Sequence, residues 1–338
     1  MRVFICGDYS NPGGPATVNR GLKSELTQEY CFLEKKRTVD KLFEVVKKTI
    51  QSDIIVFSGI IKLAFPALVL TKLLKKKIAY IMHGYLQYED KINNRENTFG
   101  ELLERKIIKS ADEIYCVSNP FAVFVRERIP EKEKHIKVLT NGIDWKYLDA
   151  MSASASEEHR GCSIAVAGGA RETKKNFNVC CAVDRINREE NIKIKLNIYG
   201  VVDEEFRSKC KDFDFIEYRG ILPKKEYLEQ ISRTRLFVSN SSFEPFGLAP
   251  VEALVLGCDV LLSKDTGVIS VMDNLTENDT IFDCESVDEI AEKIKIVLSS
   301  RNHARILSGI DREKTGNDYR AAEFDGYMRV LYKRSEKV

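Results

Sequence analysis

The sequence lacks the features of a membrane, secreted or disulfide-linked protein. No run of about 18 apolar residues occurs, so we expect no membrane-spanning helix. The opening MRVFICGDYS becomes polar too early for a secretory signal. None of the nine cysteines forms a Cys-x-x-Cys pair, and several lie in apolar runs. We therefore expect buried, reduced thiols in a cytoplasmic protein, with a metal site as the weaker alternative.

A large net charge is also absent, but the charges are unevenly distributed. The formal net charge is +2, yet residues 1–144 hold 24 Lys and Arg against 18 Asp and Glu, a net of +6. The rest of the chain holds 29 against 33, a net of −4. The basic half includes LVLTKLLKKKIAY, and the sequence ends in RVLYKRSEKV. Two interpretations stay open: solvated helix faces, or a surface that meets anionic lipid or a lipid diphosphate.

Short apolar segments alternate with helical patterns, which predicts an α/β protein with parallel, doubly wound sheets. The expected strands lie at 2–6, 53–59, 77–84, 113–118, 136–142, 162–169, 194–200, 215–220, 235–241 and 259–264. In the second half, helices are expected at 176–189, 203–211, 224–233, 247–256 and 286–299. The small, polar stretch 149–161 is interpreted as a linker. Chain length and this break predict two Rossmann-like domains, with the ligand in the cleft between them at the carboxyl ends of the strands.

One stretch of the second half, SNSSFEPFGLAPVEALVLG, places two acids around the start of a predicted helix. Glu244 precedes a Pro-Phe-Gly-Leu turn and Glu252 follows it, and neither has an obvious basic partner nearby in the sequence. Two carboxylates so placed can hold both ends of an elongated polar ligand, and a carboxylate suits the two hydroxyls of a ribose. The alternative is that both acids only favour the helix dipole.

The segment FEPFGLAPVEAL resembles the Glu-x7-Glu signature of retaining glycosyltransferases with the GT-B fold, in particular glycosyltransferase family 4 (glycosyltransferase group 1). Other stretches resemble landmarks of that family in the same order: NPGGPATVNRGL, IMHGY, ADEIYCVS, VLTNGIDWKYL, VAGGARETKKNF and RAAEFDGYMRVLY. The resemblance implies a Rossmann-like acceptor-binding domain over 1–150 and a nucleotide-sugar-binding domain over 161–312. It also implies that 313–338 returns as a helix to the N-terminal domain.

The resemblance further implies roles for single residues. Glu252 would hold the ribose of the donor, Glu244 would contact the donor sugar, and Lys174 would neutralise the leaving diphosphate. His83 would face the sugar near the reacting carbon, although a structural histidine capping a turn is the alternative; His83, Glu244 and Lys174 form the expected catalytic set. Further donor contacts would come from Gly13, Gly14, Ile221, Pro245, Phe246, Gly247 and Leu248, with Ile221 packing on the base.

The glycine-rich loop of the second half departs from the family pattern. Gly169 stands where the family usually has an arginine, five residues before Lys174. Either Arg171 reaches the same phosphates from a shifted position, or it is only a solvated loop residue. Lys175 is likewise an alternative to Lys174 as the lysine that points inward. All four positions are retained as candidate donor contacts.

The expected activity is metal-independent, retaining transfer of a sugar from a nucleotide-diphosphate donor. Asp212-Phe213-Asp214 matches the Asp-x-Asp of metal-dependent transferases, but it precedes a predicted strand, and we expect neither a metal nor a cofactor. No Gly-x-Gly-x-x-Gly follows the first strand, which argues against a nicotinamide enzyme. The donor is expected to be UDP-glucose or UDP-N-acetylglucosamine.

We expect the acceptor to be a saccharide or a lipid-linked saccharide of cell-surface polysaccharide assembly, and expect no nucleic acid partner. The basic N-terminal domain would allow peripheral contact with the inner face of the cytoplasmic membrane. The alternative is a non-catalytic, sugar-nucleotide-binding subunit of a glycosyltransferase complex, suggested by the Gly169 departure.

Overall fold

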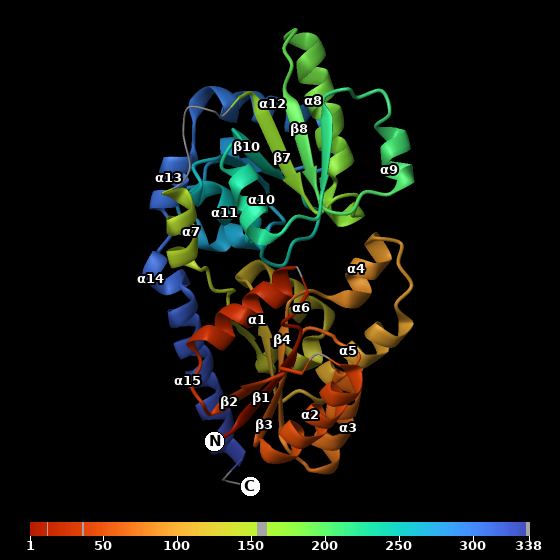
Figure 1. The fold of residues 1–338 in the computed structure, drawn as a ribbon, viewed down its shortest axis with the longest axis vertical. Helices are drawn as coiled ribbons and strands as arrows, with labels where there is room; N and C mark the ends of the chain where they lie inside the picture. The colour runs from red at the N-terminus through yellow and green to blue at the C-terminus, as the bar shows by residue number, and fades with distance from the viewer. Residues whose placement is uncertain (12, 36, 154–160, 336–338) are drawn as a thin grey trace. The chain divides into compact units, whose positions relative to one another are not determined.

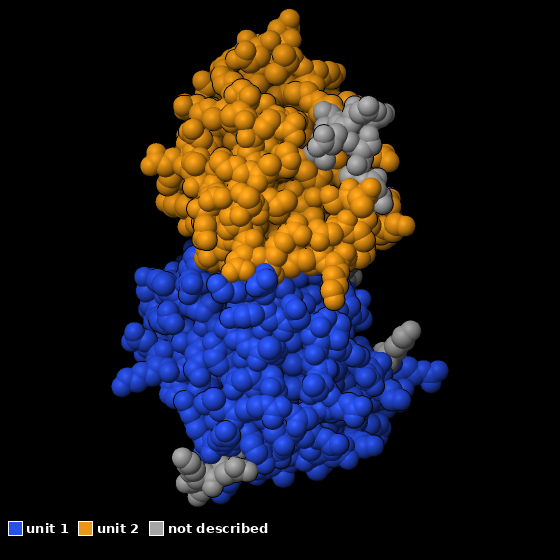
Figure 2. All heavy atoms as spheres, turned by 90° about the vertical axis from the view of Figure 1, so that its left-hand side faces the viewer, with its two compact units in different colours: residues 1–144, 313–338 blue, residues 145–312 orange. Residues whose placement is uncertain are grey.

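The computed structural model describes residues 1–11, 13–35, 37–153 and 161–335. The chain forms two compact units: unit 1 comprises Met1–Asp144 and Glu313–Val338, and unit 2 comprises Trp145–Arg312 (Figure 2). Each unit contains a six-stranded parallel sheet with helices packed on it (Figure 1). The predicted α/β fold with two Rossmann-like halves is thereby confirmed.

The division between the units falls at 144, six residues before the expected boundary at 150. Residues 145–150 belong to unit 2 because helix α7 (Trp145–Ser152) packs against α11 (Ala249–Val255) and buries Leu148. The expected linker therefore begins inside a helix. Its central residues, 154–160, lie outside the described part of the chain.

The sheet of unit 1 has the strand order β2-β1-β3-β4-β5-β6. Its strands are β1 (Val3–Gly7), β2 (Tyr30–Phe32), β3 (Ile54–Ser58), β4 (Lys77–Met82), β5 (Glu113–Cys116) and β6 (Ile136–Val138). Every residue of β1 and β3 is buried, as expected for parallel strands covered on both faces. Because the strands are parallel, their carboxyl ends lie at one edge of the sheet.

The helices of unit 1 connect successive strands. They are α1 (Gly14–Glu25), α2 (Thr38–Gln51), α3 (Ala64–Leu73), α4 (Leu86–Ile92), α5 (Thr98–Ser110) and α6 (Asn119–Arg128). After unit 2, the chain passes through α14 (Arg312–Thr315) into α15 (Asn317–Ser335), which packs against α1. The Tyr30 hydroxyl donates to Asp325 Oδ1 at 2.7 Å, so the returning helix is tied to the edge strand β2.

The sheet of unit 2 has the order β12-β11-β10-β7-β8-β9. Its strands are β7 (Ser163–Ala167), β8 (Lys195–Tyr199), β9 (Ile216–Gly220), β10 (Leu236–Ser239), β11 (Asp259–Ser263) and β12 (Thr280–Ile281). Its other helices are α8 (Asn176–Glu189), α9 (Glu204–Lys209), α10 (Lys224–Ile231), α12 (Val287–Ser300) and α13 (His303–Ser308). Apolar side chains of α8, α9 and α12 form one core with the sheet.

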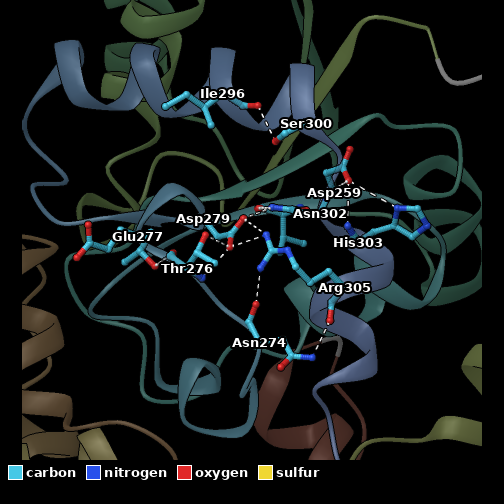
Figure 3. Close-up of polar contacts among 12 residues, drawn as sticks. Asp259, Asn274, Thr276, Glu277, Asp279, Ile296, Ser300, Asn302, His303 and Arg305 are labelled. Carbon is cyan, nitrogen blue, oxygen red and sulfur yellow. Dashed lines mark hydrogen bonds and ion pairs between the residues drawn. The ribbon is translucent and has the colours of Figure 1, made fainter.

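A buried polar network anchors α13 to the sheet of unit 2 (Figure 3). Asn302 donates through Nδ2 to the Val260 carbonyl at 2.8 Å and to Asp279 Oδ1 at 2.7 Å. Asp279 also accepts two hydrogen bonds from Arg305, at 2.8 and 2.9 Å. The backbone N–H of Asn302 donates to buried Asp259 at 2.7 Å. The network therefore fixes the last turns of unit 2 before the chain leaves it.

Candidate functional site

Two loops meet at the carboxyl ends of neighbouring strands in unit 2. β7 and β10 pair in parallel, so the loop after β7 (168–175) lies beside the loop after β10 (240–248). The backbone N–H of Ser242 donates to the Thr173 carbonyl at 2.9 Å, which joins the two loops directly. The glycine-rich loop and the predicted Glu-x7-Glu segment are thus placed side by side.

Glu244 has a cationic partner that its sequence neighbourhood does not reveal. Lys174 forms an ion pair with its carboxylate across 70 residues of sequence. The two side chains are 12% and 21% exposed. The backbone of Glu244 is fixed on both sides, because its N–H donates to Asp265 at 3.1 Å and its carbonyl accepts from Gly267 at 2.8 Å. Two of the predicted catalytic residues are therefore in contact.

The turn after Glu244 is shaped by a glycine that nothing larger could replace without strain. Gly247 has φ +90, and an added Cβ would lie 3.0 Å from Cγ of Glu244. Pro245 and Phe246 are buried, and the Phe246 carbonyl accepts from Val268 N–H at 2.7 Å. The helix predicted from 247 begins at Ala249, after Leu248, and has seven residues. The turn therefore packs closely against the Glu244 side chain.

Glu252 also has a lysine partner, contributed by α10. Lys224, the first residue of that helix, forms an ion pair with Glu252, which is only 7% exposed. The Tyr227 hydroxyl is buried beside them with no hydrogen-bond partner among the described residues. Burial, followed by the charge of Glu252, raises the pKa of Tyr227. Sequence reasoning missed Lys224 and Tyr227, since nothing local in an ordinary helix start relates them to Glu252.

The structure explains why glycine occupies position 169. Gly169 has φ +62, and an added Cβ would lie 1.9 Å from the carbonyl oxygen of Val201. Its N–H and that of Gly168 both donate to the Tyr199 carbonyl, at 2.9 and 2.8 Å. The loop therefore packs directly on the chain that follows β8, and an arginine does not fit there without moving one of the two segments.

Arg171 and Lys174 lie over the same glycine of this loop. Arg171 Nε donates to the Gly168 carbonyl at 3.3 Å. A Cβ added at Gly168 would lie 3.0 Å from both Arg171 Nη2 and Lys174 Cε. Lys175 points elsewhere: its Nζ lies 2.7 Å from Glu285 Oε1, at the start of the segment that leads into α12. The structure thus brings Arg171 and Lys174 together over Gly168, with Lys174 in contact with Glu244, while the Lys175 side chain pairs with Glu285.

Ile221 lies on the loop between β9 and α10, the helix that carries Lys224. It is 61% exposed and follows Gly220, which has φ +66. This exposed isoleucine follows a strand end and stands three residues before Lys224, the partner of Glu252. Its contact with the base of a donor stays a prediction.

His83 belongs to unit 1, where it directly follows β4. Its Nε2 lies 2.9 Å from the Ser58 hydroxyl, which donates to Asn19 Oδ1 at 2.5 Å. Asn19 Nδ2 donates in turn to the Asp8 carbonyl at 2.9 Å. Because the serine proton is used toward Asn19, Nε2–H of the histidine donates to Ser58 and leaves Nδ1 as an acceptor. Burial lowers the pKa of His83 to about 4, so the ring is neutral at pH 7.

Gly13 and Gly14 lie at the start of α1 in the same unit. Among the described residues, none has an atom within 4 Å of a Cβ added at either glycine. Internal packing therefore does not explain why glycine stands at these two positions. Close approach of a donor or acceptor to the backbone would explain the two glycines. That explanation remains a prediction.

Metal binding finds no support in side-chain clusters. In the part of the chain that the structure describes, no three or more His, Cys, Asp or Glu side chains are grouped to hold an ion. Within the Asp-x-Asp match, Asp214 pairs with Lys193 at 3.0 Å and Phe213 stacks on Phe215. Among the described helices, none has the length and apolar character that crossing a bilayer requires.

Two family models match consecutive parts of the chain. The model described as Glycosyltransferase Family 4 matches residues 5–146, and the model described as Glycosyl transferases group 1 matches residues 150–314. Together these stretches include every candidate residue named above. No curated protein matches the chain.

Solved structures share the fold over nearly the whole length. HepE from Anabaena, in complex with UDP and glucose, is 13% identical, with 97% of this chain and 99% of that chain covered and a TM-score of 0.70. Sucrose-phosphate synthase from Thermosynechococcus elongatus is 15% identical, with 99% and 100% covered and a TM-score of 0.70. A UDP-forming α,α-trehalose-phosphate synthase from Burkholderia xenovorans, in complex with glucose-6-phosphate, is 10% identical, with 98% and 100% covered and a TM-score of 0.71. At these identities the likeness establishes the fold.

Proposed function

The chain belongs to the group 1 glycosyl transferases of glycosyltransferase family 4, and from this premise we propose that it transfers glucose or N-acetylglucosamine from a UDP-sugar to a saccharide or lipid-linked acceptor. The observation that carries the proposal is the contact between Lys174 and Glu244. A cation and a carboxylate from distant segments meet at the strand ends, where nucleotides bind in such sheets.

The donor would be held by residues of unit 2. Glu252 would accept hydrogen bonds from the ribose hydroxyls, and Ile221 would pack on the base. Glu244 would accept from a sugar hydroxyl, with the backbone of 246–248 around it. On donor binding, Lys174 would turn from Glu244 toward the diphosphate, where Arg171 already lies nearby.

The proposed reaction breaks the bond between the anomeric carbon and the diphosphate oxygen. A bond from the acceptor oxygen forms on the same face, and the acceptor proton passes to the leaving phosphate. The products are the retained glycoside and UDP. Arg171 and Lys174 would stabilise the charge that develops on the diphosphate, so these side chains supply the stabilisation that a metal supplies elsewhere.

His83 fits this reaction as a neutral hydrogen-bonding group. With its pKa lowered to about 4 by burial, it is a poor proton carrier at pH 7. Its Nδ1 can accept a hydrogen bond from a hydroxyl, while Nε2–H is held by Ser58 at 2.9 Å. We therefore assign it to positioning the sugar by hydrogen bonding and give it no role in proton transfer.

UDP-glucose is the first donor to test, because HepE was solved in complex with UDP-glucose and a fold neighbour is a UDP-forming synthase. The acceptor would belong to cell-surface polysaccharide assembly. The second candidate function is donor binding without turnover, in a partner subunit of an active transferase. Gly169 favours it, since the family's arginine is missing from that position.

Donor screening with matched variants tests the proposal. UDP, GDP, ADP and dTDP sugars would be compared by thermal shift, followed by release of nucleotide with and without EDTA. We expect a shift with a UDP-sugar, turnover in EDTA, and loss of about 100-fold or more in turnover for Lys174→Ala. Lys175→Ala, whose side chain pairs with Glu285, is the matched control and should stay near wild type. Full turnover in Lys174→Ala would overturn the assignment, and binding without turnover in the wild type would favour the second function.

A further inference from the structure

Helix α2 of unit 1 exposes an apolar stripe of the kind that a surface helix normally buries. Val39, Leu42, Phe43, Val46 and Ile50 follow the i, i+3, i+4, i+7, i+11 spacing of one helix face. These side chains are between 37% and 72% exposed. The helix buries a different face against the sheet. The residues of the stripe are therefore not the ones that pack α2 onto its own unit.

The neighbouring helices extend this surface. α3 packs against both α2 and α5. On α3, Phe65, Val69 and Leu73 recur every four residues, and Leu73 is 74% exposed. On α5, Phe99 and Leu102 are each 51% exposed. The ring centroids of Phe65 and Phe99 are 6.2 Å apart, so the patches of α3 and α5 join. We call these side chains and the α2 stripe the apolar face of unit 1.

Lysines accompany the apolar side chains. Lys72 lies on the same side of α3 as its apolar row, Lys62 precedes that helix, and Lys106 and Lys109 lie on the same side of α5 as Phe99 and Leu102. The segment 62–77 contains five lysines and no acidic residue. Lys76 donates to backbone carbonyls at the end of α2 and Lys77 pairs with Asp112, so Lys62, Lys72 and Lys75 are the lysines of this segment that the face can offer to a partner. Exposed apolar rows flanked by lysines are the composition of a surface that enters the boundary of an anionic bilayer.

A pocket of about 650 Å³ adjoins this face within unit 1. Ile60, Leu86 and Phe99 line it, with Lys62 and Glu96 also at its wall. Phe99 belongs to both the pocket and the apolar face. Ile60 follows β3 and Leu86 follows β4, so the pocket lies at the strand ends where the histidine of unit 1 is also found. Phe99 thus links the exposed face to a pocket at the strand ends of unit 1.

We propose that the apolar face docks unit 1 on an anionic phospholipid bilayer. The apolar rows would enter the acyl boundary, and the lysine stems would lie along them with their ammonium groups at the lipid phosphates. A second copy of the chain suits the face poorly, because a two-fold contact through it would bring the lysines of 62–77 against their own copies. The docking itself does not depend on the proposed function. Only the reason for docking, which is access to a lipid-linked acceptor, rests on it.

Vesicle flotation without donor or acceptor tests the docking face separately from sugar transfer. Vesicles of phosphatidylcholine with phosphatidylglycerol would be compared with pure phosphatidylcholine. We expect binding to the anionic vesicles that weakens with salt. In the Phe43→Ser, Leu73→Ser double variant, the partition coefficient should fall about tenfold, equivalent to about 1.4 kcal/mol. Lys72→Glu with Lys75→Glu should reduce binding by a similar factor.

Matched controls come from exposed residues outside the face. Ile192→Ser, at 43% exposure, and Lys211→Glu, also exposed, both lie in unit 2. Both should bind vesicles like the wild type. No vesicle binding by the wild type, or equal losses in the controls, would overturn the proposal. So would light scattering that shows a dimer broken by the Phe43 and Leu73 changes, because the face would then be an interface between copies.

Discussion

Each carboxylate of the candidate donor site is paired with a lysine from a distant segment. Glu244 contacts Lys174, and Glu252 contacts Lys224. Buried or half-buried acids without a ligand need such partners, because an isolated charge is costly away from water. The acids could be identified from their local sequence pattern. Their partners could not, since the pairing depends on which strands the fold places side by side.

Position 169 allows a direct test at the residue scale. In Gly169→Ala the new Cβ would meet the Val201 carbonyl at 1.9 Å in a φ +62 conformation. We expect a loss of at least about 2 kcal/mol in unfolding free energy, together with reduced turnover, measured by chemical denaturation and nucleotide release. Gly326→Ala is the control: it lies in α15 with open space around it and should stabilise by about 0.5–1 kcal/mol. Equal effects in both variants would contradict the packing argument.

Glu104 gives a prediction for the pH dependence of stability. Burial raises the pKa of its carboxyl from 4.5 to about 7, although it accepts from the Tyr80 hydroxyl at 2.7 Å and from Leu86 N–H at 2.9 Å. Between pH 4.5 and 7 the unfolded chain releases this proton while the folded chain keeps it. The contribution of Glu104 to stability is therefore present at low pH and is lost as the pH rises through this window.

Glu104→Gln cannot ionise, so it should not lose stability over this pH window. The unfolding free energy of the variant minus that of the wild type should therefore rise by about 2 kcal/mol between about pH 5 and about pH 8. Denaturation at the two pH values measures the difference. Glu96→Gln, at an exposed site of the same unit, should show little change. A Glu104→Gln difference that is independent of pH would show that the carboxyl ionises normally in the folded protein.

At the scale of elements, strand and helix order followed from the sequence because the segments are long and strongly patterned. The helix expected at 176–189 has those bounds in the structure. β2 and β12 were missed, since three and two residues are too short to show a period. The exposed stripe of α2 was also missed, because a helical period does not say whether its apolar face is covered.

The network around α13 makes a prediction at this scale (Figure 3). Asn302→Ala removes the side-chain bonds to both backbone groups of Val260 and to Asp279. Because these partners are buried, we expect a loss of about 2–4 kcal/mol in unfolding free energy, measured by denaturation. Asn274→Ala serves as the control, since Asn274 makes two exposed side-chain bonds to α13. A loss no larger than the control's would show that the network contributes little.

At the scale of the whole molecule, the two units differ in the sign of their net charge. Unit 1 holds 30 Lys and Arg against 23 Asp and Glu, a net of +7, and unit 2 holds 23 against 28, a net of −5. The basic character belongs to the unit that carries the apolar face. The acidic unit carries Arg171 and Lys174 where a diphosphate is proposed to bind, so the expected charge attraction there is local and does not come from the unit as a whole.

The central claim is that the Glu-x7-Glu segment of unit 2 binds the nucleotide of a sugar donor. Titration calorimetry of UDP with the wild type and Glu252→Ala tests it most directly, with Glu226→Ala on α10 as control and thermal unfolding to verify the fold. We predict that UDP binds the wild type and the control equally, and that affinity falls about tenfold or more in Glu252→Ala because the ribose hydroxyls lose their acceptor. Equal affinity in all three proteins would contradict the account.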